Sequence, residues 1–347
     1  MEKLCMYLKK TEPVVTFKSG EHIFPAGIGG IQKLPMEYVS HNANNAFSPM
    51  EGQVMKKSLL ALPRQFVGPG KRGNITDPKK ATQGAVSLMS GVINPKTVEF
   101  GYISLGRPYS ISQIKINING SCQFISDKSF GDVGQQTIDF TKNLGNYNCR
   151  YTLHEDERFS QDEFLLGVHE GKWYVGLSNK DLELEVANFV KKLVEQKPFE
   201  KHTPDYGTVQ PRVHQTLEFD DRYFRVCAKT IFNYLAFVKG RDFVLQDCFD
   251  PIRDWIVNGG ENQFATLTGK ETDFSAISFP DQAHKLLITQ KGNILIGHIS
   301  FYGNGFETVV KLSDNFEGLF NLEGFICDWQ NREEYKLLDY LNSRVER

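Results

Sequence analysis

The sequence has few of the features that mark exported or membrane-bound chains. Its six cysteines are scattered over 347 residues without a regular spacing, which argues against a disulfide framework and is typical of reduced thiols. It contains no run of eighteen apolar residues that could span a membrane, and residues 1–5 lack the apolar stretch of a signal peptide. It also contains no internal repeat and no low-complexity tract. We therefore expect a cytoplasmic protein without a membrane partner.

The size and composition are those of an ordinary globular protein, but the charge is unevenly distributed. Hydrophobic residues make up 40% and charged residues 24% of a chain long enough for two or three domains. Residues 1–80 hold twelve Lys and Arg against six Asp and Glu, whereas residues 81–347 hold 28 against 36. A basic lobe on an acidic body suits a polyanion as the partner of that lobe, although chance explains such an excess equally well.

The N-terminal region reads as a short hairpin followed by a loop and helices. Residues 13–18 form a β-type run closed by Ser-Gly, residues 21–25 a second one ended by Pro, and a glycine-rich loop follows. A helix is predicted from about Ser40 to Phe47. Residues 48–51, Ser-Pro-Met-Glu, form a capping box with Pro at the first helical position, so a second helix is predicted through about residue 62.

The rest of the chain predicts a larger domain of mixed strands and helices. Residues 63–82 are rich in Pro, Gly, Lys and Arg and mark an exposed connection, so the predicted division is a lobe at 1–62, a connection at 63–82 and a second domain at 83–347. Alternating or apolar runs predict strands, and amphipathic runs predict helices. The strands are expected near 113–118, 164–169, 172–177, 285–289, 294–301 and 306–312, and the helices at 182–194, 222–238 and from about 332. The predicted fold class is α+β.

One short motif in the lobe carries the chemistry. Glu21 and His22 close the second strand, and Asn44 follows 22 residues beyond His22 on the first helix. Hydrolysis of a phosphodiester needs a base to deprotonate water and a cation to neutralise the leaving oxygen. A histidine suits the first task, and carboxylate and amide oxygens bind Mg²⁺ or Mn²⁺. Adjacent residues at a strand end point to opposite sides, so Glu21 can face a metal ion while His22 faces the water.

This region resembles the HNH (ββα-metal) endonucleases. The branch concerned has the motif Cys-x-x-Cys, then Glu-His-Ile-Ile-Pro with a Gly-Gly loop, then Cys-x-x-Cys-Asn-x-x-Phe-Gly. Here Cys5 opens the pattern, residues 21–25 read Glu-His-Ile-Phe-Pro, residues 29–30 are Gly-Gly, and residues 40–48 read Ser-His-Asn-Ala-Asn-Asn-Ala-Phe-Ser. The resemblance implies an N-terminal ββα-metal lobe.

The resemblance also assigns roles and an activity. It implies a metal-ligand role for Glu21, the general-base role for His22, and a helix-ligand role for Asn44. The expected activity is metal-dependent cleavage of nucleic acid, DNA rather than RNA, with Mg²⁺ or Mn²⁺ as cofactor. An architecture of one nuclease lobe with a large second domain suits a restriction or anti-phage defence effector, by family-level analogy.

Two departures from the family pattern affect this interpretation. Of the four zinc-ribbon cysteines only Cys5 is kept, and Leu8, Ser40 and Ala43 replace the others. One thiolate cannot hold a tetrahedral zinc, so we expect no structural zinc. A small apolar core should take its place, formed by Leu4, Leu8, Phe24, Ala43 and Phe47. The central Asn that orients the base should fall near residues 34–36, where there is none, so the partner of His22 is not identified.

Several further residues are weaker candidates. His41 and Asn45 are additional metal-ligand candidates next to Asn44, although a solvated helix start explains His41 better. Basic residues of the lobe and its connection could contact the nucleic-acid backbone, and an ordinary solvated surface explains any one of them equally well. These are Lys56, Lys57, Arg64, Lys71 and Arg72.

Two other functions stay open. The lost cysteines and the missing Asn suit a non-catalytic nucleic-acid-binding protein with a decayed HNH lobe. A ligand sensor, in which the C-terminal region carries the main function, is the other alternative. Residues 228–236, 240–245 and 249–256 resemble the C-terminal region of long HNH proteins, to which we can assign no chemistry. Target recognition, regulation or homo-oligomerisation are the roles expected of the whole second domain, residues 83–347.

Overall fold

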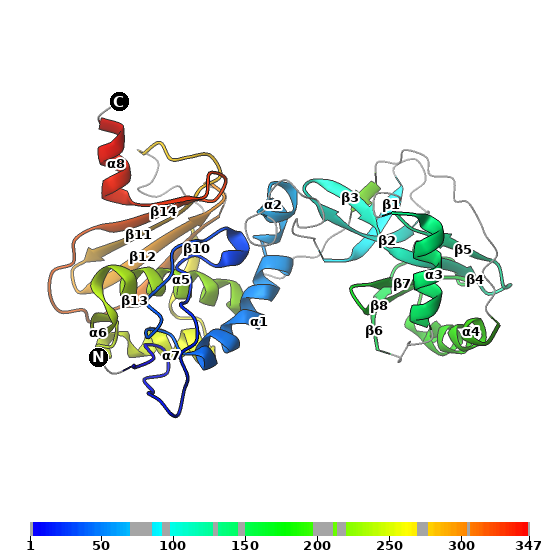
Figure 1. Ribbon diagram of the computed structural model, residues 1–347, viewed down its shortest axis with the longest axis horizontal. Helices are drawn as coiled ribbons and strands as arrows, with labels where there is room; N and C mark the ends of the chain where they lie inside the picture. The colour runs from blue at the N-terminus through cyan, green and yellow to red at the C-terminus, as the bar shows by residue number, and fades with distance from the viewer. Residues whose placement is uncertain are drawn as a thin grey trace. The chain divides into compact units, whose positions relative to one another are not determined.

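The fold is α+β and consists of two compact units. A computed structural model describes residues 3–69, 85–91, 98–127, 131–144, 150–196, 211–213, 220–268, 277–303 and 306–345. Over these residues the chain forms three β-sheets and eight α-helices (Figure 1). Unit 1 comprises Met1–Gln83 and Leu217–Arg347, and unit 2 comprises Gly84–Thr216.

The division of the chain into compact units differs from the predicted domain division. The boundary expected near residue 83 coincides with the start of unit 2, but the segment 83–347 is not a single domain. Residues 217–347 fold with the N-terminal lobe, because the apolar side chains of the two segments belong to one buried cluster. A lobe of about sixty residues buries too little surface to be stable alone, and the C-terminal segment supplies the missing core.

Unit 1 is built on a six-stranded antiparallel sheet of order β10-β13-β12-β11-β14-β15. The three strands expected near 285–312 are present as its central members. The strands are β10 (Ala265–Thr268), β11 (His284–Lys291), β12 (Ile294–Phe301), β13 (Phe306–Ser313), β14 (Glu323–Asp328) and β15 (Glu333–Lys336).

Helix α5 (Asp221–Lys239) lies against this sheet and is buried along most of its length. At Gly297 in β12 an added Cβ would come within 2.4 Å of Ile231, so the helix approaches the strand closely where no side chain intervenes. The hydroxyl of Tyr234 also donates to the carbonyl of Gly324 at 2.6 Å. The opposite side of α5 faces α1 and the N-terminal lobe, which makes α5 the centre of unit 1.

The helices between residues 40 and 62 differ from the predicted pair. A single helix, α1 (His41–Lys57), runs through Pro49, which lies on its exposed side. Ser40 caps it by accepting a hydrogen bond from the Ala43 amide at 3.2 Å. Buried residues on both sides of the proline, Phe47 and Met50 among them, keep the helix continuous by packing. The capping box at residue 48 therefore does not start a new helix.

The remaining helices of unit 1 are short. The C-terminal helix begins five residues later than expected, because residues 333–336 pair with β14 as an edge strand. These helices are α2 (Ala61–Phe66), α6 (Arg241–Val244), α7 (Asp250–Asn258) and α8 (Leu337–Val345).

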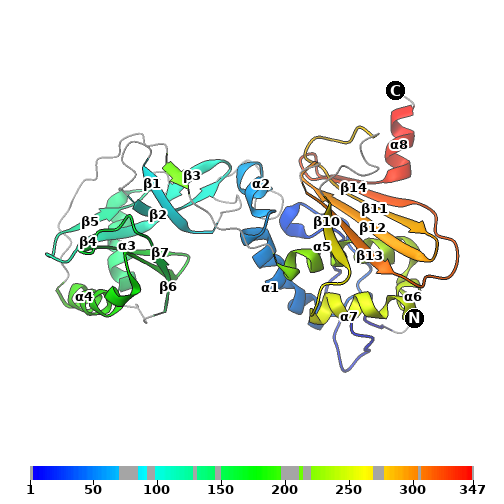
Figure 2. The ribbon, with the colours of Figure 1, turned by 180° about the vertical axis from the view of Figure 1, so that it is seen from behind.

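Unit 2 consists of a four-stranded sheet, a five-stranded sheet and two helices (Figure 2). The first sheet has the order β3-β2-β1-β9 and the second β5-β4-β7-β8-β6, in which only the β6–β8 pair is parallel among the strands described. The predicted hairpin at 164–177 is β7 and β8, and the predicted helix at 182–194 is α4. The elements are β1 (Ser87–Gly91), β2 (Val98–Ser104), β3 (Arg107–Ser110), β4 (Ser112–Asn117), β5 (Cys122–Ile125), α3 (Val133–Leu144), β6 (Tyr151–Glu155), β7 (Glu163–His169), β8 (Lys172–Leu177), α4 (Glu183–Gln196) and β9 (Pro211–Val213).

Among the residues described above, no helix is both long enough and apolar enough to cross a bilayer.

Candidate functional site

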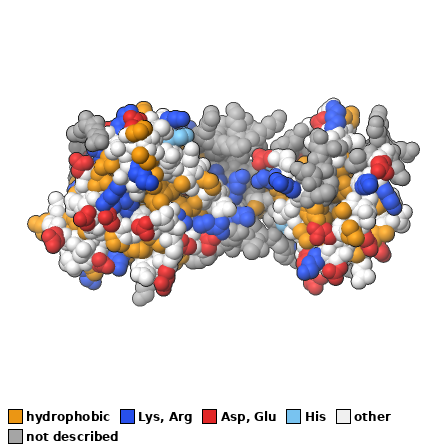
Figure 3. All heavy atoms as spheres, turned by 90° about the horizontal axis from the view of Figure 1, so that it is seen from below, with side chains coloured by type: hydrophobic (Ala, Val, Ile, Leu, Met, Phe, Trp, Pro, Cys, Tyr) orange, Lys and Arg blue, Asp and Glu red, His pale blue; other side chains and the backbone are white. Residues whose placement is uncertain are grey.

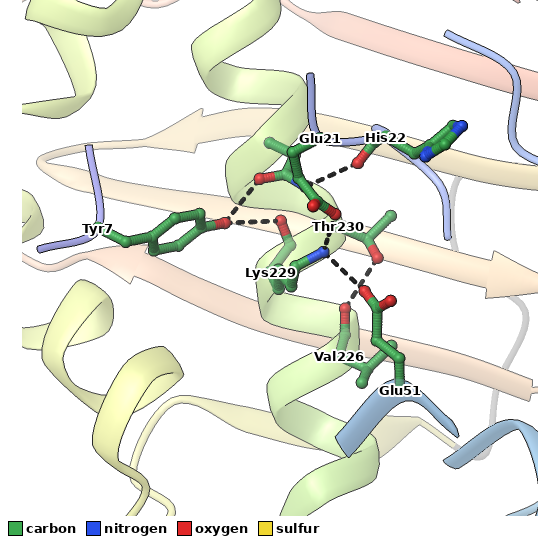
Figure 4. Close-up of polar contacts among 8 residues, drawn as sticks. Tyr7, Glu21, His22, Glu51, Val226, Lys229 and Thr230 are labelled. Atoms are coloured by element: carbon green, nitrogen blue, oxygen red, sulfur yellow. Dashed lines mark hydrogen bonds and ion pairs between the residues drawn. The ribbon is translucent and has the colours of Figure 1, made fainter. Parts of the chain in front are cut away.

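Glu21 and His22 lie on a short ladder rather than on the predicted two-stranded hairpin. Residues 13–18 form turns and irregular backbone, and His22 pairs with Lys33 as an isolated antiparallel bridge. The Ile23 amide donates to the Gln32 carbonyl at 2.9 Å, which continues this pairing. Side chains alternate along such a segment. Glu21 is accordingly buried, and the half-buried His22 ring points to the other side, away from Lys229 (Figure 4).

The Glu21 carboxylate belongs to a buried ionic cluster. The Lys229 ammonium, on α5, donates to Glu21 Oε1 at 2.6 Å and to Glu51 Oε1, on α1, at 2.7 Å (Figure 4). The side chain of Lys229 is 0% exposed, that of Glu21 7% and that of Glu51 21%. Three segments far apart in the sequence thus meet at one ammonium group. We call Glu21, Glu51 and Lys229 the buried ion cluster.

The two carboxylates keep the Lys229 side chain charged. Burial by itself lowers the pKa of a lysine, because it removes the ammonium from water. The charges of Glu51 and Glu21 and their hydrogen bonds outweigh this effect and raise the pKa of Lys229 above its ordinary value. The group is therefore a permanent cation at the end of a short, charge-assisted hydrogen bond to Glu21.

A second set of contacts fixes the backbone beside His22. The Asn233 amide, one turn beyond Lys229 on α5, donates to the His22 carbonyl at 2.8 Å. The Tyr7 hydroxyl in turn donates to Asn233 Oδ1 at 2.7 Å, which orients that amide. Asn233 thus holds the main chain of His22, in the absence of the family's central Asn. These contacts do not involve the imidazole ring.

The His22 ring lines a pocket that encloses about 370 Å³. Arg332, Trp329 and Ile31 contribute to its walls, together with the glycine-rich loop. Burial lowers the pKa of His22, and the nearby charge of Lys33 lowers it further, against the opposing effect of Glu21. The imidazole is therefore neutral at pH 7 and available to accept a proton.

The loop that forms this pocket is attached to the sheet through His284. An added Cβ at Gly30 would come within 1.9 Å of the Phe24 carbonyl, so only glycine allows the loop to fold back here. The fully buried His284 ring lies 3.0 Å from the Ile28 carbonyl through Nε2 and accepts the Tyr302 amide at 3.0 Å through Nδ1. These two contacts require a neutral ring with its proton on Nε2.

This histidine predicts a pH-dependent stability. Burial lowers the pKa of His284 from 6.5 to about 3. The unfolded chain therefore binds this proton more tightly, and the free energy of unfolding should fall by up to about 1.4 kcal/mol per pH unit between pH 6.5 and 3. Above pH 6.5 the contribution is complete. Urea unfolding at several pH values should show a smaller slope for His284→Asn; an unchanged slope would contradict the assignment.

The other predicted metal ligands lie at the start of α1, about two turns from Glu51. Asn44 is half-buried on the first turn, and Glu51, which reaches Lys229, lies seven residues later on the same face of the helix. Seven residues of α-helix correspond to roughly 10 Å along the axis. His41 and Asn45 interact with each other, at 3.1 Å between Nε2 and Nδ2, on the exposed surface. The ligand roles of Asn44, Asn45 and His41 stay predictions.

The predicted nucleic-acid contacts divide into three cases. Lys56 and Lys57 are exposed on the last turn of α1, as such contacts require. Arg64 is 8% exposed, and its guanidinium donates to the carbonyls of Gly27 and Met55 at 2.7 and 3.2 Å, which contradicts a phosphate contact through this side chain. Arg64 supports the glycine-rich loop instead. Lys71 and Arg72 lie outside the described residues.

The excess of positive charge in the predicted basic lobe is balanced by the other residues of unit 1. Residues 217–347 hold fourteen Lys and Arg against twenty Asp and Glu, which offsets the excess of positive charge in residues 1–83. On the face seen in Figure 3, basic and acidic side chains of unit 1 are interspersed. The overall charge of this unit therefore gives no support to a polyanion partner.

The contacts of Glu21 in the buried ion cluster are not those expected of a ligand to a divalent metal ion. Glutamate oxygens are suitable ligands for Mg²⁺, but Glu21 Oε1 already accepts the Lys229 ammonium, which Glu21 shares with Glu51. Within the described ranges, no group of three or more His, Cys, Asp or Glu side chains could hold a metal ion. The metal-ligand role of Glu21 therefore stays a prediction. In the structure the Lys229 ammonium is the cation that binds this carboxylate.

Two of the four positions at which the HNH pattern has zinc-ribbon cysteines are in contact. The Ser40 amide donates to the Cys5 sulfur at 3.3 Å. Ala43, Phe24 and Phe47 are buried as predicted and Leu8 is partly buried, but these residues do not form a separate core. Together with Met6 and Tyr7 they belong to the large apolar cluster of unit 1.

We predict that this lobe folds without zinc. One thiolate, together with the hydrogen bond from Ser40 and the shared apolar core, leaves no ligand set for a tetrahedral site at Cys5. Elemental analysis after dialysis against EDTA should find no zinc, and the thermal unfolding midpoint should not change. One tightly bound zinc per chain, with loss of folding on its removal, would show that other residues replace the cysteines.

The residues that sequence reasoning missed are on α5 and α1. Lys229 and Asn233 lie on the polar face of a predicted amphipathic helix, and a polar face is ordinarily solvated. The sequence does contain a signal for their burial. Residues 226–236 are apolar apart from Lys229, Thr230 and Asn233, which indicates a helix that is apolar on several faces. A helix that is apolar on several faces is a buried one, and its polar residues then need partners.

Comparisons with known proteins add no relative. No protein-family model, no curated protein and no solved structure matches the chain. The likeness to the HNH endonucleases therefore rests on the sequence alone, chiefly on the motif residues of the N-terminal lobe.

Proposed function

We propose that the chain is an HNH-type endonuclease that hydrolyses phosphodiester bonds of nucleic acid, with His22 as the general base. The observation that carries the proposal is the placement of His22. Its ring has a lowered pKa and lines a pocket with Arg332, whereas its neighbour Glu21 faces the interior. A neutral imidazole that shares a pocket with an arginine suits a site that deprotonates water next to a phosphate.

The proposed reaction is a hydrolysis at phosphorus. His22 takes a proton from water, the water oxygen bonds to phosphorus, and the bond from phosphorus to the 3′-oxygen breaks. The leaving oxygen takes up a proton, which gives a 5′-phosphate and a 3′-hydroxyl. The dependence on Mg²⁺ or Mn²⁺ stays a prediction, because Glu21 has a cationic partner of its own in Lys229.

A cleavage assay tests the proposal. Plasmid DNA, single-stranded DNA and RNA should be incubated with the full chain in Mg²⁺, in Mn²⁺ and in EDTA, and the ends of the products identified by labelling. We expect cleavage, of DNA before RNA, with 5′-phosphate ends. Absence of cleavage of all three substrates under every condition would refute the proposal.

A second function is favoured by one observation. The ion pair between Lys229 and Glu21 satisfies the carboxylate that a metal ion would need, which suits a non-catalytic nucleic-acid-binding protein built on a decayed HNH lobe. Retention of DNA or RNA in a filter-binding assay, without cleavage, would support this alternative. A ligand-sensing role stays open as well, and a molecule that co-purifies with the chain would support it.

The proposed setting follows from the nuclease assignment. We propose a cytoplasmic protein with DNA as its partner, acting in restriction or anti-phage defence. Homo-oligomerisation is part of this proposal only as a role for residues outside the lobe. Sedimentation of the purified chain measures the oligomeric state.

A further inference from the structure

We propose that Lys229 is the resident cation of the Glu21 site and that it excludes a divalent metal ion from Glu21 in the folded chain. The proposal goes beyond the nuclease assignment, because it concerns what binds the carboxylate and not whether nucleic acid is cleaved. It rests on the buried ion cluster, in which three segments of unit 1 converge on one ammonium group.

The geometry of the cluster is that of an occupied cation site. The Lys229 ammonium is 2.6 Å from Glu21 Oε1 and 2.7 Å from Glu51 Oε1. The ring of Phe47 lies 5.3 Å from the same nitrogen and closes a third side. The main chain is tied down next to the cluster, since Asn233 binds the His22 carbonyl. A side chain with no exposed surface and two carboxylate partners has no freedom to leave.

A divalent cation and this ammonium exclude each other at Glu21. Metal–oxygen bonds of Mg²⁺ are about 2.1 Å long, so an ion on the same oxygen would lie within about 5 Å of the Lys229 nitrogen. Two carboxylates would then share three positive charges in a site largely shielded from solvent, where such charges repel each other strongly. The single charge of Lys229 instead leaves the cluster with one negative charge in excess.

Mn²⁺ uptake by the full chain tests the proposal without reference to cleavage. The free Mn²⁺ signal in electron paramagnetic resonance should be titrated with the natural chain and with Glu21→Gln. We expect the two to take up the same amount of Mn²⁺. One additional Mn²⁺ per chain in the natural protein, lost in Glu21→Gln, would overturn the proposal whatever the outcome of the nuclease assay.

A second variant tests whether Lys229 takes the place of a metal ion. Lys229→Met removes the ammonium and leaves the carboxylates of Glu21 and Glu51 facing each other. A folded Lys229→Met chain should gain one Mn²⁺ site, and adding Glu21→Gln should abolish it. Lys239→Met, on the same helix, should gain none.

The outcomes are decisive in each case. A folded Lys229→Met chain without additional Mn²⁺ uptake would overturn the idea of replacement. A merely structural role of Lys229 would not create a metal site when the side chain is removed. If this variant does not fold, the comparison between the natural chain and Glu21→Gln decides alone.

Discussion

Replacement of Lys229 by Met is expected to lower the free energy of unfolding of unit 1 by about 3–5 kcal/mol. Removing one member of a buried ion pair leaves its partners without compensation in a medium of low dielectric constant, and that penalty is of this size. Here two carboxylates lose their common partner, and Glu21 is only 7% exposed. Methionine has a similar length and keeps most of the apolar contacts, so the effect isolates the charge.

Urea unfolding followed by tryptophan fluorescence measures this change. Trp255 and Trp329 belong to unit 1, and in a Trp173→Phe background they report this unit alone. Lys239→Met is the matched control. Lys239 lies on the same helix as Lys229 and pairs with Glu323 of β14 at 2.8 Å, but its side chain is 26% exposed. The control should lose less than about 1 kcal/mol. A loss below about 1 kcal/mol in Lys229→Met as well would contradict the role of the buried ion cluster.

Replacement of His22 by Ala is expected to reduce the rate of phosphodiester cleavage by about 10²–10⁴-fold, the usual contribution of a general base. Binding of nucleic acid should be unchanged, because the ring is assigned to proton transfer and not to a phosphate contact. The main chain should also keep its place, since Asn233 holds the His22 carbonyl and not the ring. Single-turnover rates and filter binding, measured on the same preparation, separate the two effects.

A second histidine variant controls for this comparison. His169 is at the end of β7 in unit 2 and belongs to no proposed site. His169→Ala should cleave at the rate of the natural chain. Full activity of His22→Ala would refute the assignment of the base, whereas an equal loss in both variants would point to a general loss of structure.

Local patterns predicted several of the longer elements from the sequence. Helix α5, the hairpin of β7 and β8 and the three strands β11 to β13 follow from apolar periodicity, which depends only on neighbours in the chain. The failures arose where a long-range contact decides. Helix α1 continues through Pro49 because Phe47 and Met50 are buried against other segments, and no local signal reports such packing.

The division into units was missed for the same reason. A connection rich in Pro and Gly marks the end of a compact segment, but it does not say whether the chain later returns to it. Here residues 217–347 return and complete the core of the lobe, with α5 between α1 and the sheet. Contacts between segments far apart in the sequence establish this, such as that of Tyr7 with Asn233, which are 226 residues apart.

The candidate site was predicted in part. The opposite orientations of Glu21 and His22 follow from the alternation of side chains along an extended segment, and the structure has them so. The partner of Glu21 could not be predicted, because Lys229 is 208 residues away in sequence. A lysine on an amphipathic helix is expected in water, and its burial follows only from the packing of α5 on both sides.

The pH dependence of kcat/KM for cleavage tests the central claim, that His22 acts as a neutral base, most directly. Burial and Lys33 lower the pKa of His22 below 6.5. Since the protonated ring cannot accept a proton, the rate should fall at acidic pH, with a midpoint below 6.5 that is missing from the residual activity of His22→Ala. A midpoint above 6.5, or a rate that does not fall at acidic pH, would contradict the claim.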